Sequence, residues 1–211
     1  MNSVCYITGA GENYGIDFRP AACDYVIAAD GGLKYLKEVG IDADMVIGDF
    51  DTYGSRPDHK NVVQLNREKD ITDTYAAIEE GLKLGYSEFH LYCCLGGKLD
   101  HTLANIQIMA GMAKKGIKIY LHGDGIVMTA VSGGSIRFDG GCQGMVSIFS
   151  HSDQAEGITL KGLKYTLDDA CLSSDFPLGI SNEFTGEEAF IEVKKGTLIA
   201  VVPEEAIKWQ V

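Results

Sequence analysis

The sequence has few basic residues for its length. Lys and Arg together number 18 among 211 residues, against 30 Asp and Glu, and the formal net charge is −12. Surfaces that bind nucleic acids use clusters of Lys and Arg, so this balance argues against a nucleic-acid partner. A phosphate ligand beside so acidic a chain would need a counterion, and a divalent metal ion is the simplest candidate.

The sequence also lacks an apolar run near the ~20 residues that a membrane span requires. Its first residues, MNSVCYITGAGENYG, contain no basic stretch followed by a long apolar one. They therefore predict a first strand and no signal peptide. The hydrophobic fraction of 45% and the charged fraction of 23% are typical of a chain that folds around a core. This length suits one large domain or two small ones.

No Cys-x-x-Cys pair occurs, which makes a zinc site a poor explanation for the six cysteines. They stand at positions 5, 23, 93, 94, 142 and 171. Several lie in apolar runs, where a free cysteine behaves as a small hydrophobic residue. We therefore expect reduced thiols and a cytoplasmic protein.

Short apolar runs alternate with helical patterns up to about residue 122. The runs VCYITG, YVIAAD, DMVIGD, NVVQL, FHLYCCL and IKIYLH are rich in Val, Ile, Tyr and Phe, which is typical of buried strands. Helices are expected from Leu33 to a stop at Gly40, from near Thr72, and over about 102–115. Alternating strands and helices predict a mainly parallel sheet with helices on both faces, a three-layer α/β domain over residues 1–123.

The pattern after residue 124 consists of short strand-like runs without a long helix. Among them are GIVMTAV, GSIRF, GMVSIF, LKYTL, AFIEV and GTLIAVV, with glycine, Asp-Asp and KKG segments between them as expected turns. This spacing predicts an antiparallel sandwich or barrel. We assign residues 124–211 to a β-sandwich domain.

Polar or glycine-rich groups follow five of the predicted parallel strands. Ligands bind beyond the carboxyl ends of strands in such sheets, so these groups are expected to meet at one edge. In chain order they are Gly9-Ala10-Gly11-Glu12; Asp30, Gly31 and Gly32; Asp49 and Asp51; Asp70, Thr72 and Asp73 of KDITD; and Gly97, Lys98, Asp100 and His101 of LGGKLDH.

The residue types at this edge predict a metal–polyphosphate site. Carboxylates supply the hard oxygen ligands that Mg²⁺ accepts together with substrate phosphates. Thr72 is expected to cap a helix whose first amides point at an anion, and Lys98 would neutralise a phosphate charge. Catalysis at such a site rests on positioning and charge stabilisation.

Structural roles are the alternative for each of these residues. Asp49 and Asp51 could form turns, and Asp30 or Asp70 could cap a helix. Asp73 could serve only the helix dipole. For His101, a structural hydrogen bond competes with a role as a base.

Three other functional classes are alternatives to a metal–polyphosphate site. Gly9-x-Gly11 with Asp30 imitates a dinucleotide fingerprint, but the third glycine should stand at position 14, which is Tyr14. The segment DFDT is similar to the D-x-D motif of aspartyl-phosphate phosphatases, but their Thr usually stands two residues after the second Asp, whereas Thr52 follows Asp51 immediately. A non-catalytic nucleotide-binding module stays open, because only an assay distinguishes it.

Several motifs together resemble the thiamine pyrophosphokinase (thiamine diphosphokinase) family. They are AADGG at 28–32, IGDFDT at 47–52, KDITD at 69–73, LGGKLDH at 95–101, and the Ser-Asn pair of GISNEF. The resemblance implies an α/β nucleotide domain followed by a β-sandwich domain for thiamine binding and dimerisation. It implies transfer of the diphosphoryl group of ATP to the hydroxyl of thiamine, a requirement for Mg²⁺, and homodimers with active sites between subunits. Another Mg-dependent phosphotransferase that uses a nucleotide is the alternative, and a dinucleotide-binding oxidoreductase is a more remote one.

The resemblance also implies roles for individual residues. Metal ligands would be Asp49, Asp51 and Asp73, with Asp30 at the same edge. Nucleotide and polyphosphate contacts would come from Asp30, Gly31, Gly32, Thr72, Gly97, Lys98 and His101. The catalytic carboxylates would be Asp70, Asp73 and Asp100, and either Asp73 or Asp100 would accept the hydroxyl proton. Ser181 and Asn182 would face thiamine. Two positions depart from the family, which more often has Arg at Lys98 and Ser at Thr52.

Overall fold

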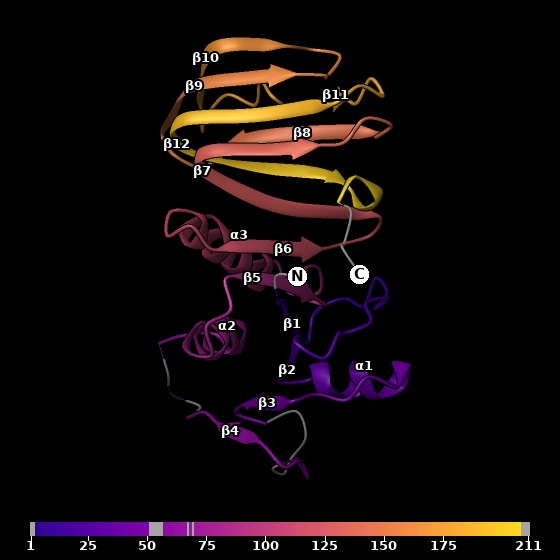
Figure 1. Ribbon diagram of the computed structural model, residues 1–211. Coiled ribbons are helices and arrows are strands. Elements are labelled where there is room, and N and C mark those ends of the chain that lie inside the picture. The colour runs from indigo at the N-terminus through magenta and orange to yellow at the C-terminus, as the bar shows by residue number, and fades with distance from the viewer. Residues whose placement is uncertain (1–2, 51–56, 67, 69, 208–211) are drawn as a thin grey trace. The chain divides into compact units, whose positions relative to one another are not determined.

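The computed structural model describes residues 3–50, 57–66, 68 and 70–207. They form two compact units (Figure 1). One contains residues up to Ile108 together with Tyr120–Asp124, and the other contains Met109–Ile119 and residues from Gly125 onward. Within the described part of the chain, no helix has both the length and the hydropathy needed to cross a membrane.

The first unit is built on a parallel sheet. Its strands are β1 (Cys5–Thr8), β2 (Tyr25–Ala29), β3 (Met45–Gly48), β4 (Val62–Gln64), β5 (Glu88–Tyr92) and β6 (Lys118–His122). The order is β6-β5-β1-β2-β3-β4, and the pairs from β5 to β4 are all parallel. The helices are α1 (Gly32–Val39), α2 (Asp73–Lys83) and α3 (Leu99–Ala113). The predicted α/β architecture is confirmed.

Alternation along the strands assigns each helix to one face of this sheet. A Cβ atom on Gly81 of α2 would lie 2.5 Å from the Phe89 ring and 3.1 Å from the Cys5 sulfur. Val26 instead joins a buried cluster with Leu36 of α1. Helices α1 and α2 therefore cover opposite faces, as Figure 1 shows. The carboxyl ends of the strands are left uncovered by this packing.

The helix boundaries follow local sequence signals. Thr72 has an extended backbone, and its hydroxyl oxygen accepts a hydrogen bond from the Tyr75 amide at 3.1 Å, so the predicted N-cap of α2 is confirmed. Gly40 ends α1 with φ of 72°. Helix α3 begins three residues before the predicted start, because Gly96 and Gly97, at φ of 70° and 67°, turn the chain directly into it.

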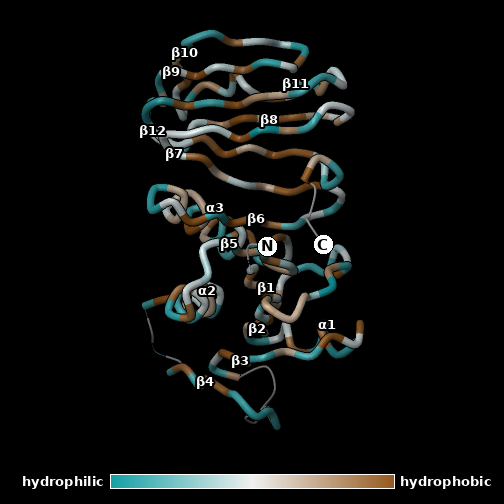
Figure 2. Tube along the Cα trace, viewed as in Figure 1, coloured by the Kyte–Doolittle hydropathy of each residue, from teal (hydrophilic) through white to brown (hydrophobic). Residues whose placement is uncertain are grey.

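The second unit is antiparallel and all-β. Its elements are β7 (Ile126–Phe138), β8 (Met145–Ser150), β9 (Gln154–Lys161), β10 (Leu167–Ser173), β11 (Asn182–Glu183), β12 (Ala189–Pro203) and the 3₁₀ helix η2 (Glu204–Ala206). Strand β12 pairs with β7, with β9 through its first part and with β8 through its second. Strands β7 and β8 are hydrophobic over much of their length (Figure 2). Strand β10 pairs with β9 and also contacts β8.

Several turns expected in the second half are absent. The run GIVMTAV continues through Gly133 and Gly134 into GSIRF as the single strand β7. Likewise AFIEV and GTLIAVV form β12, and the KKG segment between them is taken up by a register shift between Val193 and Thr197. The Asp-Asp pair lies inside β10, where the register also shifts and Asp169 has φ of 49°. These segments form β-bulges, which bend a strand without ending it.

Two buried histidines make the stability of the first unit depend on pH. His90 Nδ1 and His122 Nε2 lie 3.3 Å apart, and the side chains are 1% and 3% exposed. Burial lowers the pKa of both, and that of His122 falls to about 3 through burial and the nearby His90. A pKa lower in the folded state gives stability that is complete above the unfolded value near 6.5 and is lost as the pH falls toward 3.

We expect the contribution of His122 to the free energy of unfolding to fall by about 2 kcal/mol between pH 7 and pH 5, at 1.36 kcal/mol per pKa unit. Urea unfolding at the two pH values measures it, with His122→Phe as the control, because Phe keeps a ring against Tyr92. The variant should lose this part of the pH dependence. An identical dependence in both proteins would show that His122 is not its source.

Candidate functional site

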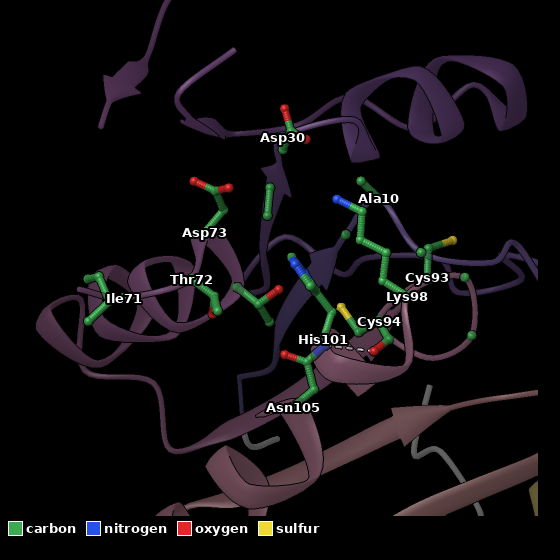
Figure 3. Close-up of a pocket in the computed structure, with 16 residues that line it drawn as sticks. Ala10, Asp30, Ile71, Thr72, Asp73, Cys93, Cys94, Lys98, His101 and Asn105 are labelled. Atoms are coloured by element: carbon green, nitrogen blue, oxygen red, sulfur yellow. Dashed lines mark hydrogen bonds between the residues drawn. The ribbon is translucent and has the colours of Figure 1, made fainter. Parts of the chain in front are cut away.

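A cavity of about 370 Å³ lies at the carboxyl ends of the parallel strands. Figure 3 shows Lys98 and His101 extending toward the space bordered by Asp30 and Asp73. The cavity is lined by Gly9, Ala10, Gly11, Ala29, Asp30, Ile71, Thr72, Asp73, Thr74, Cys93, Cys94, Gly96, Gly97, Lys98, His101 and Asn105. Segments far apart in the sequence therefore meet at one site, and all of them belong to the first unit.

The residues to which a role in the site was assigned fall into five groups. Six line the cavity: Asp30, Thr72, Asp73, Gly97, Lys98 and His101. Gly31, Gly32 and Asp49 adjoin lining segments, whereas Asp70 and Asp100 are exposed and do not line it. Ser181 and Asn182 belong to the second unit. Asp51 lies outside the described residues, as does Thr52.

Shortly after each of three strands near the cavity, a residue other than glycine has a left-handed backbone. Asp30 follows β2 with φ of 46°, Phe50 follows the end of β3 with φ of 59°, and Cys93 follows β5 with φ of 53°. Such conformations cost about 1–3 kcal/mol each and cluster at functional sites. Phe50 is 3% exposed and packs in the hydrophobic core, while Asp49 stays half-buried beside it.

The backbone amides of the first glycine-rich loop donate hydrogen bonds to carbonyl oxygens at and after the end of β5. The amides of Gly9, Gly11 and Glu12 donate to the carbonyl oxygens of Tyr92, Cys93 and Leu95, at 2.9, 2.7 and 3.0 Å. A Cβ on Gly9 or Gly11 would come within 2.8 Å of Cys93 O. These glycines thus allow two chain segments to approach, and their amides are not available to a phosphate. This arrangement disfavours the dinucleotide-binding alternative.

Two helix N-termini supply positive potential to the cavity instead. Thr72, Asp73 and Thr74 line it at the start of α2, and Lys98 and His101 line it at the start of α3. The first amides of any helix have no acceptor within the helix and attract anions. Lys98 immediately precedes α3 and His101 lies in its first turn, three residues later, so both side chains lie at the start of the helix. Anionic phosphates would meet both kinds of donor here.

The carboxylates near the cavity suit a divalent cation whose remaining ligands are waters and substrate phosphates. Asp30 and Asp73 line the same cavity, and a Cβ on Gly48, next to Asp49, would lie 3.2 Å from the Asp30 Cα. The described residues contain no group of three or more His, Cys, Asp or Glu that could hold a metal alone. Mg²⁺ usually takes one or two carboxylates, with waters and substrate phosphates completing its octahedron, so this donor set suits it.

Some lining residues were not identified from the sequence. Burial raises the pKa of the Cys93 and Cys94 thiols to about 12, so these side chains form the cavity wall and are not nucleophiles. Asn105 is 5% exposed, and its amide nitrogen donates to Cys94 O at 2.6 Å. Its position four residues after His101 is a helical-spacing signal that could have revealed it.

One residue of the Ser-Asn pair in the second unit is bonded to the backbone of an exposed tyrosine. Asn182 is 4% exposed; its oxygen accepts from the Tyr165 amide at 2.9 Å and its nitrogen donates to Tyr165 O at 2.7 Å. The Tyr165 side chain itself is 62% exposed. Ser181 is exposed, has φ of 56°, and donates its amide to the Ser147 hydroxyl at 3.1 Å. Asn182 therefore holds Tyr165 in place.

Comparisons with known proteins agree in both halves of the chain. Residues 20–121 match the family model described as thiamin pyrophosphokinase, catalytic domain, and residues 135–198 match thiamin pyrophosphokinase, vitamin B1 binding domain. The chain is 29% identical to the thiamine pyrophosphokinase of Bacillus subtilis (strain 168), over 95% of this chain and 98% of that protein.

Solved structures of the same family share the fold. The crystal structure of thiamine pyrophosphokinase from Bacillus subtilis aligns with a TM-score of 0.83 and 25% identity, covering 95% of this chain and 98% of that one. The thiamin pyrophosphokinase from Geobacillus thermodenitrificans aligns with a TM-score of 0.82 and 24% identity, over 97% and 100% of the two chains.

Proposed function

The chain belongs to the thiamin pyrophosphokinase family, and we propose that it transfers the diphosphoryl group of ATP to the hydroxyl of thiamine, giving thiamine diphosphate and AMP. The observation that carries this proposal is the cavity, where two carboxylates, a lysine and two helix N-termini converge. We assign ATP binding and catalysis to residues 1–123, and thiamine binding and dimerisation to residues 124–211.

Mg²⁺ is the proposed metal, with Asp49, Asp51 and Asp73 as its ligands and Asp30 beside them. It would neutralise charge on the phosphates and polarise them toward attack. The chain's own donors complete the polyphosphate site: Lys98, His101 and the first amides of α2 and α3 would bind phosphate oxygens. Lys98 provides a point charge, where the family more often has the bidentate donor Arg. We propose that the backbone of Gly31 and Gly32, which adjoin Asp30, borders the nucleotide; the missing side chain of Gly32 serves the close approach of α1 to Thr8 O of β1.

In the proposed reaction the thiamine hydroxyl oxygen attacks the β-phosphorus in line, and the bond from that phosphorus to the AMP oxygen breaks. Asp73 lines the cavity at the start of α2, so we favour it over Asp100 for orienting the hydroxyl and accepting its proton. Asp100 accepts a hydrogen bond from the His101 amide at 3.0 Å, which places it at the start of α3. Asp70 stands just before α2, and we propose that Asp70 and Asp100 act on the polyphosphate path from these two helix starts.

For thiamine, we propose that Ser181 and the ring of Tyr165 make the contacts, with Asn182 positioning Tyr165. A planar cationic heterocycle suits an exposed aromatic ring, through stacking and cation–π attraction. Tyr165→Ala is expected to raise KM for thiamine about 10-fold and to leave KM for ATP near its original value. Tyr165→Phe keeps the ring and should behave as the unaltered protein. Equal KM values for thiamine in all three proteins would contradict the role of Tyr165.

A homodimer is also proposed, and an exposed apolar face on the second unit supports it. Met145 and Phe149 of β8 are 61% and 39% exposed, and Phe176, Leu178 and Ile180 are 63%, 53% and 45% exposed. The Ile148 amide donates to Gly179 O, which places the two segments side by side. Contiguous exposed apolar groups mark association surfaces. Sedimentation equilibrium should give twice the 22.8 kDa chain mass, whereas a monomer at micromolar concentration would refute the proposal.

The reduced state of the cysteines supports the proposed cytoplasmic location. All six are free thiols, as expected for a reducing compartment. Fractionation of the source cells would test this location, and recovery outside the cytoplasmic fraction would contradict it.

The test of the function is an incubation of the protein with ATP, MgCl₂ and thiamine, followed by chromatography of the thiamine products. Thiamine diphosphate should form only when all three are present, and chelation of Mg²⁺ should abolish its formation. Turnover of ATP without any phosphorylated thiamine would instead indicate another nucleotide-using phosphotransferase.

A further inference from the structure

Asn105 connects the wall of the cavity to helix α3. It lies on the same helix face as Lys98 and His101, at spacings of seven and four residues, and all three line the cavity. Figure 3 shows its bond to Cys94 as a dashed line. A side-chain amide that is 95% buried in such a place has a strong requirement for hydrogen-bond partners at both ends.

The orientation of this amide is fixed by its neighbour. The Cys94 carbonyl oxygen can only accept, so the atom 2.6 Å from it must be the nitrogen of Asn105. The carbonyls on either side, of Cys93 and Leu95, are taken by the Gly11 and Glu12 amides. The chain after β5 is therefore held by hydrogen bonds from the first glycine-rich loop and from α3. Asn105 cannot rotate its amide without leaving Cys94 O unpaired.

The side-chain oxygen, Oδ1, is consequently the end of the amide that is available to a ligand. Among the described residues, none donates a hydrogen bond to Oδ1, and Asn105 lines the cavity. Oδ1 is an acceptor only. It attracts an N–H or O–H group and repels a phosphate oxygen, which is itself an acceptor.

We propose that Asn105 is a specificity-determining residue whose Oδ1 accepts a hydrogen bond from a donor group on the nucleoside part of ATP. This inference rests on the proposed use of ATP at the cavity. ATP offers two kinds of donor away from its phosphates, the exocyclic amine of adenine and the ribose hydroxyls. The lysine and the helix N-termini bind the phosphates, and Asn105 distinguishes the nucleoside.

The test compares four nucleotides in the full-length protein: ATP, ITP, 2′-deoxyATP and 3′-deoxyATP. ITP replaces the exocyclic amine by an oxygen, and each deoxy analogue removes one hydroxyl. We expect kcat/KM, measured as thiamine diphosphate formed, to fall about 10-fold or more for one of the three analogues, since a hydrogen bond to a buried acceptor is lost. The analogue affected identifies the donor.

Asn105→Leu then links this loss to the residue. The variant should lower kcat/KM for ATP about 10-fold and cause no further loss with the analogue that lacks the donor, as in a double-mutant cycle. Gln107→Leu, on an exposed position of the same helix, is the matched control and should leave all four values unchanged.

Equal kcat/KM values for all four nucleotides in the unaltered protein would overturn the proposal, even if the variant failed to fold. A loss in Asn105→Leu of the same size for every nucleotide would also overturn it, because that is the mark of a purely structural residue. Calorimetric binding of the four nucleotides without thiamine gives the same comparison. If no thiamine diphosphate forms with ATP but the nucleotides bind selectively, the proposed function fails and the role of Asn105 stands.

Discussion

Replacing Asp73 by asparagine is expected to lower kcat by about 10²-fold or more, because the variant loses a charge directed at the proposed metal–phosphate site. Asp73 lines the cavity as the first residue of α2. Asparagine has nearly the same shape, and the lost interaction with the helix dipole costs at most about 1 kcal/mol of folding free energy. Steady-state kinetics and urea unfolding of the same preparation separate the two effects.

Glu79→Gln is the matched control for this variant. It removes one negative charge from the same helix at a residue that does not line the cavity. Its kcat should stay within about twofold of the original, since a surface charge change has little effect there. Near-normal turnover in Asp73→Asn would remove Asp73 from the proposed catalytic and metal roles.

Gly32→Ala is expected to have the largest effect on the fold. A Cβ at this position would lie 1.9 Å from the Thr8 carbonyl oxygen, and that oxygen belongs to β1 and cannot move aside as a flexible side chain would. Helix α1 would have to shift away from the sheet, at a cost of about 3 kcal/mol or more in the free energy of unfolding. Thermal and urea unfolding would measure this loss.

A second glycine provides the comparison for that result. Gly111 lies inside α3, and a Cβ there would meet no atom within 4 Å. Gly111→Ala should therefore be neutral or stabilising, by up to about 1 kcal/mol. Two variants with equal stability would show that the close approach of Gly32 to β1 does not constrain the packing of α1.

The position of the site was predictable because one topological rule applies to every parallel strand. Asp30, Thr72, Asp73, Lys98 and His101 each follow a strand in the sequence, and the structure brings all five to one cavity. The rule needs only the order of strands and helices, which the hydrophobic pattern supplies.

Other features of the structure depend on which distant segments of the chain pair with one another, and a single sequence does not reveal this pairing. The amides of Gly9 and Gly11 are taken by the segment after β5 because β1 pairs with β5 in the sheet. The bonds of the Asn182 amide to the backbone of Tyr165, 17 residues away, are likewise invisible in the sequence, and the placement of Asn182 facing thiamine stays a prediction. The KKG segment of β12 forms a bulge because partners on both sides hold the strand together.

Diphosphoryl transfer can be followed with ATP that carries ³²P only on its β-phosphorus. Incubation with thiamine and Mg²⁺ should place the label in thiamine diphosphate and release one unlabelled AMP for each molecule formed. Transfer of the γ-phosphoryl group alone would leave the label in ADP beside unlabelled thiamine monophosphate, and that result would contradict diphosphoryl transfer.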